Sequence, residues 1–166
     1  MTIDSATTAS AAGSRVTPHR RSTIARATLY LGAVAVLATG VDHIQQYYVD
    51  DYSTVPTIGT LFFLNFVSAV VITAGLIAPL RRLAGRHADA IRTLFAVGGI
   101  GLGLLSLAAL FVSESIGLFG FVEHGYRTPI ALAIVAEAAA VVLLGIFLAA
   151  TVTGSRSGSS APGSVI

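Results

Sequence analysis

The sequence predicts an all-α integral membrane protein in which four transmembrane helices form one bundle. Three observations support this fold class: 54% of the 166 residues are hydrophobic, 11% are charged, and the apolar residues fall into four long runs. A soluble domain carries about 25% charged residues, whereas a helix needs about 20 apolar residues to cross a bilayer. The runs lack the strict alternation of barrel strands, so we expect helices, which satisfy their own backbone hydrogen bonds in lipid.

Each apolar run gives one expected span. The expected spans cover residues 24–49, 55–80, 91–121 and 128–152. The last has the clearest start, because Thr128 can cap a helix and Pro129 suits the first helical position, where no N–H partner is needed. Pro56 and Pro79 bracket the second span in a similar way.

Both ends of the chain differ in composition from the membrane domain expected at residues 23–153. Residues 1–22 are rich in Ser, Thr and Ala, and residues 154–166 are rich in Gly and Ser, so we expect disordered cytoplasmic tails. An alternative is that Arg20-Arg21 begins a cleaved twin-arginine signal, which would leave three spans. No A-x-A-like cleavage site stands where such a signal should end, which favours an uncleaved first span.

The basic residues predict the orientation of the spans. All ten are arginines, and nine of them lie at alternate span ends: Arg15, Arg20, Arg21, Arg26, Arg81, Arg82, Arg86, Arg92 and Arg156. Basic residues beside spans are retained in the cytoplasm. We therefore expect a multi-pass protein with both termini cytoplasmic, and with the loops at 50–56 and 122–127 facing outward.

Composition also limits the chemistry and the partners. The chain has no cysteine, which excludes disulfides, thiolate zinc sites, thiol nucleophiles and covalently attached c-type haem. The arginine-rich loop could bind anionic lipid headgroups, although setting topology is sufficient to explain it. No basic stripe is interleaved with aromatic residues, so nucleic acid is not an expected partner. The expected partner is the lipid bilayer.

Small residues follow one face of each predicted helix. Helices in lipid associate through close packing of small side chains and through polar contacts. The small residues expected at helix contacts are Gly40, Gly99, Gly103, Ala133, Ala136 and Ala140. In each span the polar residues lie on the same side as the small ones, so we expect all four faces to point into one bundle.

These polar residues predict a ligand or proton site in the outer half of the membrane. At about 1.5 Å per residue, Glu137 and Asn65 lie about 14 Å deep, while Asp42 and His43 lie about 5–10 Å deep. Glu114 is expected near the outer mouth. Ionisable groups inside a span usually face the bundle and often mark function. The Glu137 carboxyl is expected to hold a proton or to have a partner such as His43 or Asn65.

Several chemistries remain open at this site. His43 and Glu137, with Glu114 or Asp42, could bind a metal ion, although no H-x-x-x-H or E-x-x-H spacing supports this. Haem held by two histidines would need His43 and His124. A proton-coupled carrier would use Glu137 as its titratable acid. No catalytic residue or nucleophile–base set is recognisable, and no cofactor is identified.

The aromatic residues beside the first span have a simpler interpretation. Tyr47, Tyr48 and Tyr52 follow the apolar run at its outer end. Tyrosine is enriched where a span meets the water interface. We therefore expect all three to form an interfacial belt.

One group of sequence features resembles a known family. Gly40-Val-Asp-His43 leading to Tyr47-Tyr48, then Val55-Pro56-Thr-Ile-Gly59 and Leu61-Phe62-Phe63, is similar to a pattern in small four-span membrane proteins of actinobacteria. Their architecture resembles that of DoxX-like four-helix proteins. The resemblance covers the four spans and implies four helices in a bacterial cytoplasmic membrane. It implies no catalytic residue.

Together these features predict a small membrane protein with an outward-facing polar pocket. We expect a non-enzymatic binding or accessory module, working in a larger membrane complex or as a homo-oligomer. A proton-coupled carrier of a small solute and a metal- or haem-binding redox protein are the alternatives.

Overall fold

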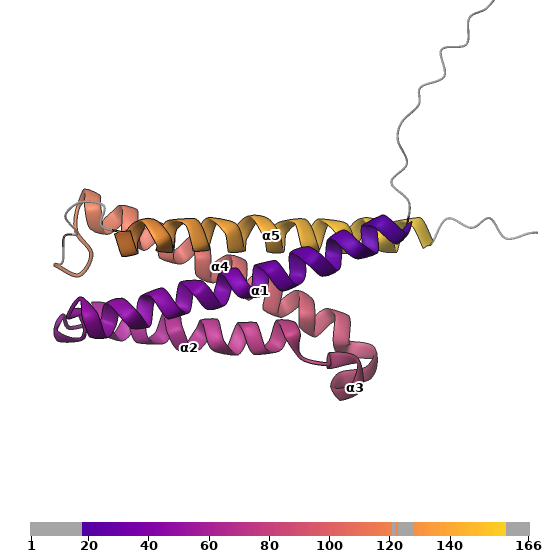
Figure 1. The fold of residues 1–166 in the computed structure, drawn as a ribbon, viewed down its shortest axis with the longest axis horizontal. Helices are drawn as coiled ribbons and strands as arrows, with labels where there is room; N and C mark the ends of the chain where they lie inside the picture. The colour runs from indigo at the N-terminus through magenta and orange to yellow at the C-terminus, as the bar shows by residue number, and fades with distance from the viewer. Residues whose placement is uncertain (1–17, 121, 123–127, 159–166) are drawn as a thin grey trace, which may run out of the picture.

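Helices make up nearly all of the computed structural model, which describes residues 18–120, 122 and 128–158 (Figure 1). The long helices are α1 (Pro18–Val49), α2 (Ile58–Ile77), α4 (Ala88–Ser115) and α5 (Thr128–Gly158). The short elements are η1 (Tyr52–Thr54), α3 (Leu80–Ala84) and η2 (Gly85–His87). No β-strand occurs among the described residues.

Four helical segments are long and apolar enough to cross a membrane. They are Thr23–Val49, Ile58–Ile77, Leu80–Ser115 and Thr128–Thr153. The all-α class and the four span-length helices are therefore confirmed for the described part of the chain. Such a set suggests a multi-pass membrane protein.

Two helices extend beyond the spans predicted from apolar content. α1 begins at Pro18, so residues 18–22, expected in a disordered tail, are helical. Proline is well suited to the first helical position because its φ is already helical and its missing N–H needs no partner. α5 continues to Gly158, so residues 154–158 are helical as well. A helix can continue past the last apolar residue, and hydropathy therefore underestimates its length.

The predicted span at 91–121 is too long at its second end. α4 stops at Ser115, and Gly117 and Phe119 then adopt φ angles of 83° and 52°. Backbone with positive φ cannot continue a right-handed helix. The apolar residues Ile116, Leu118 and Phe119 therefore belong to a turn that follows the helix.

The four long helices run alternately in opposite directions (Figure 1). α1 packs extensively against α5 and α2, while α4 packs against α5 and, more sparsely, against α2. α1 and α4 make few contacts, so the order around the bundle is α1, α2, α4, α5. The start of α1, the end of α5 and α3 lie at one end, called the arginine end (Figure 1). η1 and the end of α4 lie at the opposite end, called the loop end.

The distribution of polar and apolar side chains between interior and surface is the reverse of that in a soluble protein. Many large apolar side chains are exposed, among them Leu31, Val34 and Leu105, whereas Gln46, Asn65 and Glu137 are buried. Soluble proteins rarely bury charged side chains fully and rarely expose extended apolar surfaces. The outer surfaces of these helices therefore suit contact with lipid.

The half of the bundle toward the arginine end has a filled apolar core. Its buried side chains include Leu29, Ala33, Val36, Leu76, Ala96 and Leu144.

Glycine permits close approach at three of the contacts predicted from small residues. A Cβ on Gly40 would lie 2.6 Å from the Ala69 Cβ, one on Gly99 would lie 2.6 Å from Leu144 Cδ1, and one on Gly103 would lie 3.1 Å from the Glu137 carbonyl oxygen. Ala133 and Ala140 are buried, while Ala136 is half-buried.

Candidate functional site

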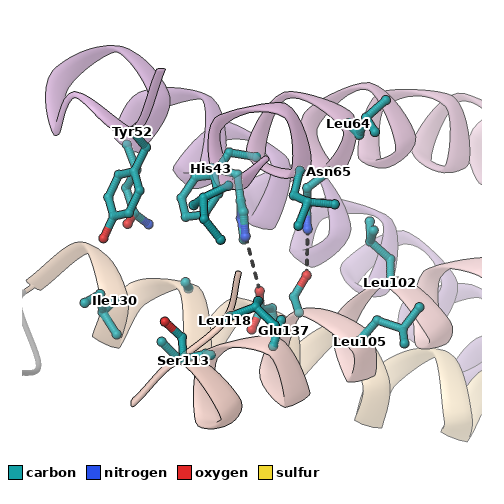
Figure 2. Close-up of a pocket in the computed structure, with 18 of the residues that line it drawn as sticks. His43, Tyr52, Leu64, Asn65, Leu102, Leu105, Ser113, Leu118, Ile130 and Glu137 are labelled. Atoms are coloured by element: carbon teal, nitrogen blue, oxygen red, sulfur yellow. Dashed lines mark hydrogen bonds and ion pairs between the residues drawn. The ribbon is translucent and has the colours of Figure 1, made fainter. Parts of the chain in front are cut away.

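A cavity of about 350 Å³ lies in the half of the bundle toward the loop end. Residues of all four long helices line it, and Tyr52 of η1 and Leu118 complete the wall. Figure 2 shows the labelled side chains converging from helices on both sides of the space. Most of the lining is apolar, including Ile58, Leu61, Phe62, Leu64, Leu105 and Ile130. A volume of this size is in the range of small-molecule sites.

Polar side chains gather along one part of this apolar wall. They are His43, Gln46, Asn65, Ser68, Ser106, Ser113 and Glu137. They come from α1, α2, α4 and α5, so each long helix contributes at least one. The site therefore depends on assembly of the whole bundle.

Glu137 is the most deeply buried ionisable residue of the site. Its side chain is 2% exposed, and its carboxyl hydrogen-bonds with the Ser106 hydroxyl of α4. The neighbouring turns of α5 carry Ala133 and Ala140, whose small side chains let the other helices close around the carboxyl. Gly103 of α4 packs against the Glu137 backbone, which brings α4 within reach.

His43 faces Glu137 from α1 (Figure 2). Its Nδ1 donates a hydrogen bond of 2.9 Å to the Thr39 carbonyl oxygen, because a carbonyl can only accept. This fixes the ring so that Nε2 points to Glu137 Oε1 at 3.9 Å. That separation exceeds a direct hydrogen bond, so the two groups face each other without one. The Phe62 ring packs on the imidazole, with ring centroids 4.8 Å apart.

Asn65 extends the polar cluster to α2. Its Nδ2 donates a hydrogen bond of 2.6 Å to the Ser106 Oγ, which also hydrogen-bonds Glu137. The Asn65 Oδ1 is buried and has no hydrogen-bond partner among the described residues. A buried acceptor without a partner is costly, so Asn65 retains capacity for one further hydrogen bond.

Asp42 does not line the cavity but hydrogen-bonds Gln46, which does. The Gln46 Nε2 donates a hydrogen bond of 2.5 Å to Asp42 Oδ2, one helical turn away on α1. Gln46 lines the cavity, whereas Asp42 does not, although Asp42 is within electrostatic range of Glu137. Glu114 is half-buried near the end of α4 and does not line the cavity either. The structure thus brings together His43, Asn65 and Glu137.

Tyr52 does not belong to an interfacial belt, so that expectation is wrong for this residue. Its side chain is 4% exposed and stacks on Phe62, with centroids 4.6 Å apart and planes 12° apart. The backbone folds back onto α2 because Gly59 has no side chain: a Cβ there would lie 2.5 Å from the Tyr52 carbonyl oxygen. Tyr48, in contrast, is 68% exposed.

The metal candidates His43 and Glu137 lie close together in the described part of the chain. Nowhere among them do three His, Asp or Glu side chains come together as metal ligands. His43 and Glu137 form a pair without a third ligand of this type. Glu123, His124 and Arg127 lie outside the described residues, so the haem hypothesis that needs His124 stays a prediction.

Ser106 and Gln46 are site residues that the sequence analysis did not assign to the site. Ser106 follows Gly99 and Gly103 on the small-residue side of α4, and Gln46 lies one turn after Asp42. That spacing was a usable signal for Gln46, because residues four apart on a helix are neighbours. No local signal pairs Ser106 with Asn65, since 41 positions separate them.

Comparison with known protein families, curated proteins and solved structures finds no match to this chain. The similarity to DoxX-like proteins therefore stays a prediction. The geometry of the site is the basis for a functional proposal.

Proposed function

We propose that the chain is a multi-pass protein of a bacterial cytoplasmic membrane, with the arginine end in the cytoplasm. Arg81, Arg82 and Arg86 are exposed at this end, on α3 and η2 between α2 and α4. Basic residues in short loops are retained on the cytoplasmic side. This orientation puts the cavity in the outer half of the bilayer.

The absence of native cysteine makes this orientation directly testable. Ser53 in η1 and His87 in η2 are both exposed, and neither carries a topological positive charge. A membrane-impermeant maleimide should label Ser53→Cys in intact cells and His87→Cys only after permeabilisation. The opposite labelling pattern would refute the orientation.

We further propose that the protein is a non-enzymatic binding module for a lipid-soluble small molecule. One observation carries this proposal: the cavity is apolar over most of its wall and has a cluster of hydrogen-bonding groups from all four helices. Small-molecule sites combine these two properties, an apolar wall for affinity and a few polar groups for orientation.

A catalytic role receives less support from the same contacts. Ser106 is a nucleophile by residue type, yet it hydrogen-bonds Asn65 and Glu137. His43, the side chain suited to act as its base, uses Nδ1 for the Thr39 carbonyl and turns Nε2 toward Glu137. Hydrolysis through an activated serine needs the base beside the hydroxyl. Binding is the simpler function for this arrangement.

The His43–Glu137 pair is the observation that favours the second candidate, a proton-coupled carrier. Such a carrier also needs access from the opposite side of the membrane. The apolar core around Val36, Leu76 and Leu144 fills that half of the bundle. Flux through liposomes under a pH gradient tests the carrier, and transport that is unchanged in Glu137→Gln would remove Glu137 from its mechanism.

The test of the binding function is purification in mild detergent followed by mass spectrometry of all retained small molecules. Ala109 lines the cavity, while its neighbour Ala108 is exposed and does not line it. We expect a lipophilic molecule in preparations of the native protein and of Ala108→Phe, and its loss from Ala109→Phe. Equal retention by the two variants would contradict binding in the cavity. Proteins recovered in the same preparation would test the accessory role in a larger complex.

A further inference from the structure

The wall of the cavity is open between α2 and α4. Leu61, Leu64 and Leu105 all line the cavity, yet they are 40%, 51% and 73% exposed. Largely exposed side chains in the cavity lining indicate the side on which the cavity opens. α2 and α4 are also the most sparsely packed of the neighbouring helix pairs. The opening therefore lies on the apolar side surface of the bundle.

Described side chains lie at both ends of the cavity. Tyr52, which stacks on Phe62, lies at the same end of the cavity as Ile130, which is 3% exposed. Figure 2 shows Tyr52 and Ile130 at this end. Toward the arginine end, the buried core begins with Ala69 and Val36. A molecule thus reaches the polar cluster most directly from the side, by passing the leucines at the opening.

The polar cluster is unsuited to an anion. The lining contains no Arg or Lys, while Glu137 lies in it and Asp42 lies close behind Gln46. A head group of either charge would also have to lose its water while passing an apolar opening, which is expensive for an ion. An uncharged head group avoids this penalty.

The hydrogen-bonding groups of the cluster favour an uncharged head group that can donate a hydrogen bond. Asn65 Oδ1 is a buried acceptor without a partner among the described residues. Asn65 lines the cavity and the terminal torsion of an asparagine is broad, so rotation of the amide can turn this oxygen toward a ligand. A hydroxyl can donate to such an acceptor and also accept from a neighbouring donor. An ether or a ketone cannot donate.

We propose that the ligand is an uncharged amphiphile with a hydroxyl head, which enters from the lipid between α2 and α4. Its hydroxyl lies against Asn65 and Glu137, and its apolar chain extends past Leu64 and Leu105 toward the lipid. This inference rests on the proposed binding function and names the chemical class of the ligand.

The test measures binding of four probes with the same chain: decanol, its methyl ether, decanoate and decylamine. Full-length protein in detergent micelles is used, and Ala109→Phe gives the background for each radiolabelled probe. We expect decanol to bind about tenfold more tightly than the ether, the effect of one hydrogen bond. Asn65→Leu should remove that difference. A charged probe or the ether binding as tightly as decanol would overturn the inference while leaving the binding function intact.

A failure of the binding function itself gives a different result. In that case no probe would bind above the Ala109→Phe background, and both proposals would be overturned. Because Asn65→Leu could unfold the bundle, a second measurement uses the native sequence. A decanol analogue with a diazirine at the end of its chain should label peptides of α2 and α4 that contain Leu61, Leu64 or Leu105. Labelling confined to α1 and α5 would contradict entry between α2 and α4.

Discussion

The two halves of this bundle are built from the same four helices, yet one is filled and the other contains a cavity. Toward the arginine end, Val36, Leu76 and Leu144 interlock and are almost completely buried. Toward the loop end, the facing positions are occupied by Asn65, Ser106 and Glu137, and about 350 Å³ stays open beside them. In lipid there is little hydrophobic gain from association, so tight packing holds one half together and leaves the other available for polar groups.

The largest effect is expected from a substitution that creates a cavity in the filled half. Leu144 is completely buried, and Leu144→Ala should lower the free energy of unfolding by about 2–5 kcal/mol, because the rigid surroundings cannot collapse into the space. Leu94→Ala is the matched control, since Leu94 is 69% exposed. Unfolding followed by circular dichroism in detergent measures both. Equal losses would show that the core around Leu144 is not tightly packed.

A smaller effect is expected from forcing two helices apart. Gly40→Ala would bring two Cβ atoms within 2.6 Å at Ala69, and neither atom can rotate away. We expect a loss of about 1–3 kcal/mol in unfolding free energy from overpacking. Gly101 has open space at its Cβ position, so Gly101→Ala should leave stability unchanged or raise it through helix propensity. If both variants behave alike, the close contact between α1 and α2 is not as described.

The smallest effect concerns the polar half. Ser106→Ala removes the hydroxyl shared by Asn65 and Glu137, and should cost about 1 kcal/mol, in line with side-chain hydrogen bonds between helices in membranes. Ser115→Ala is the control, because the Ser115 hydroxyl is exposed and bonds only to its own helix. A double-mutant cycle of Ser106→Ala with Asn65→Leu should show coupling. Additive effects would mean that the two side chains do not interact.

The number of long helices could be predicted from the sequence because each one contains a long apolar run. Few structures other than a membrane-spanning helix require such a run. The positions of the helix ends could not. Pro18 and Gly158 lie outside the apolar runs, and the turn at Gly117 and Phe119 lies inside one. Hydropathy reports which residues tolerate lipid, whereas helix ends depend on backbone geometry.

Part of the site could also be predicted. His43, Asn65 and Glu137 are polar residues that the sequence places in the same half of their spans, on small-residue faces, and those two properties can be read along one helix. The cavity and the link through Ser106 depend on how α2 and α4 cross, which no single helix encodes. The burial of Tyr52 depends on the backbone passing over Gly59. A tyrosine at the end of an apolar run has the same sequence pattern whether it is buried or faces the interface.

The stack of Tyr52 on Phe62 has a spectroscopic consequence. The chain contains no tryptophan, so tyrosine emission is not lost by energy transfer to an indole. Tyr30 and Tyr48 are exposed on the surface, while Tyr52 is buried in the wall of the cavity. Among the described tyrosines Tyr52 is the buried one, so a molecule entering the cavity would change its surroundings, and its emission would report occupancy.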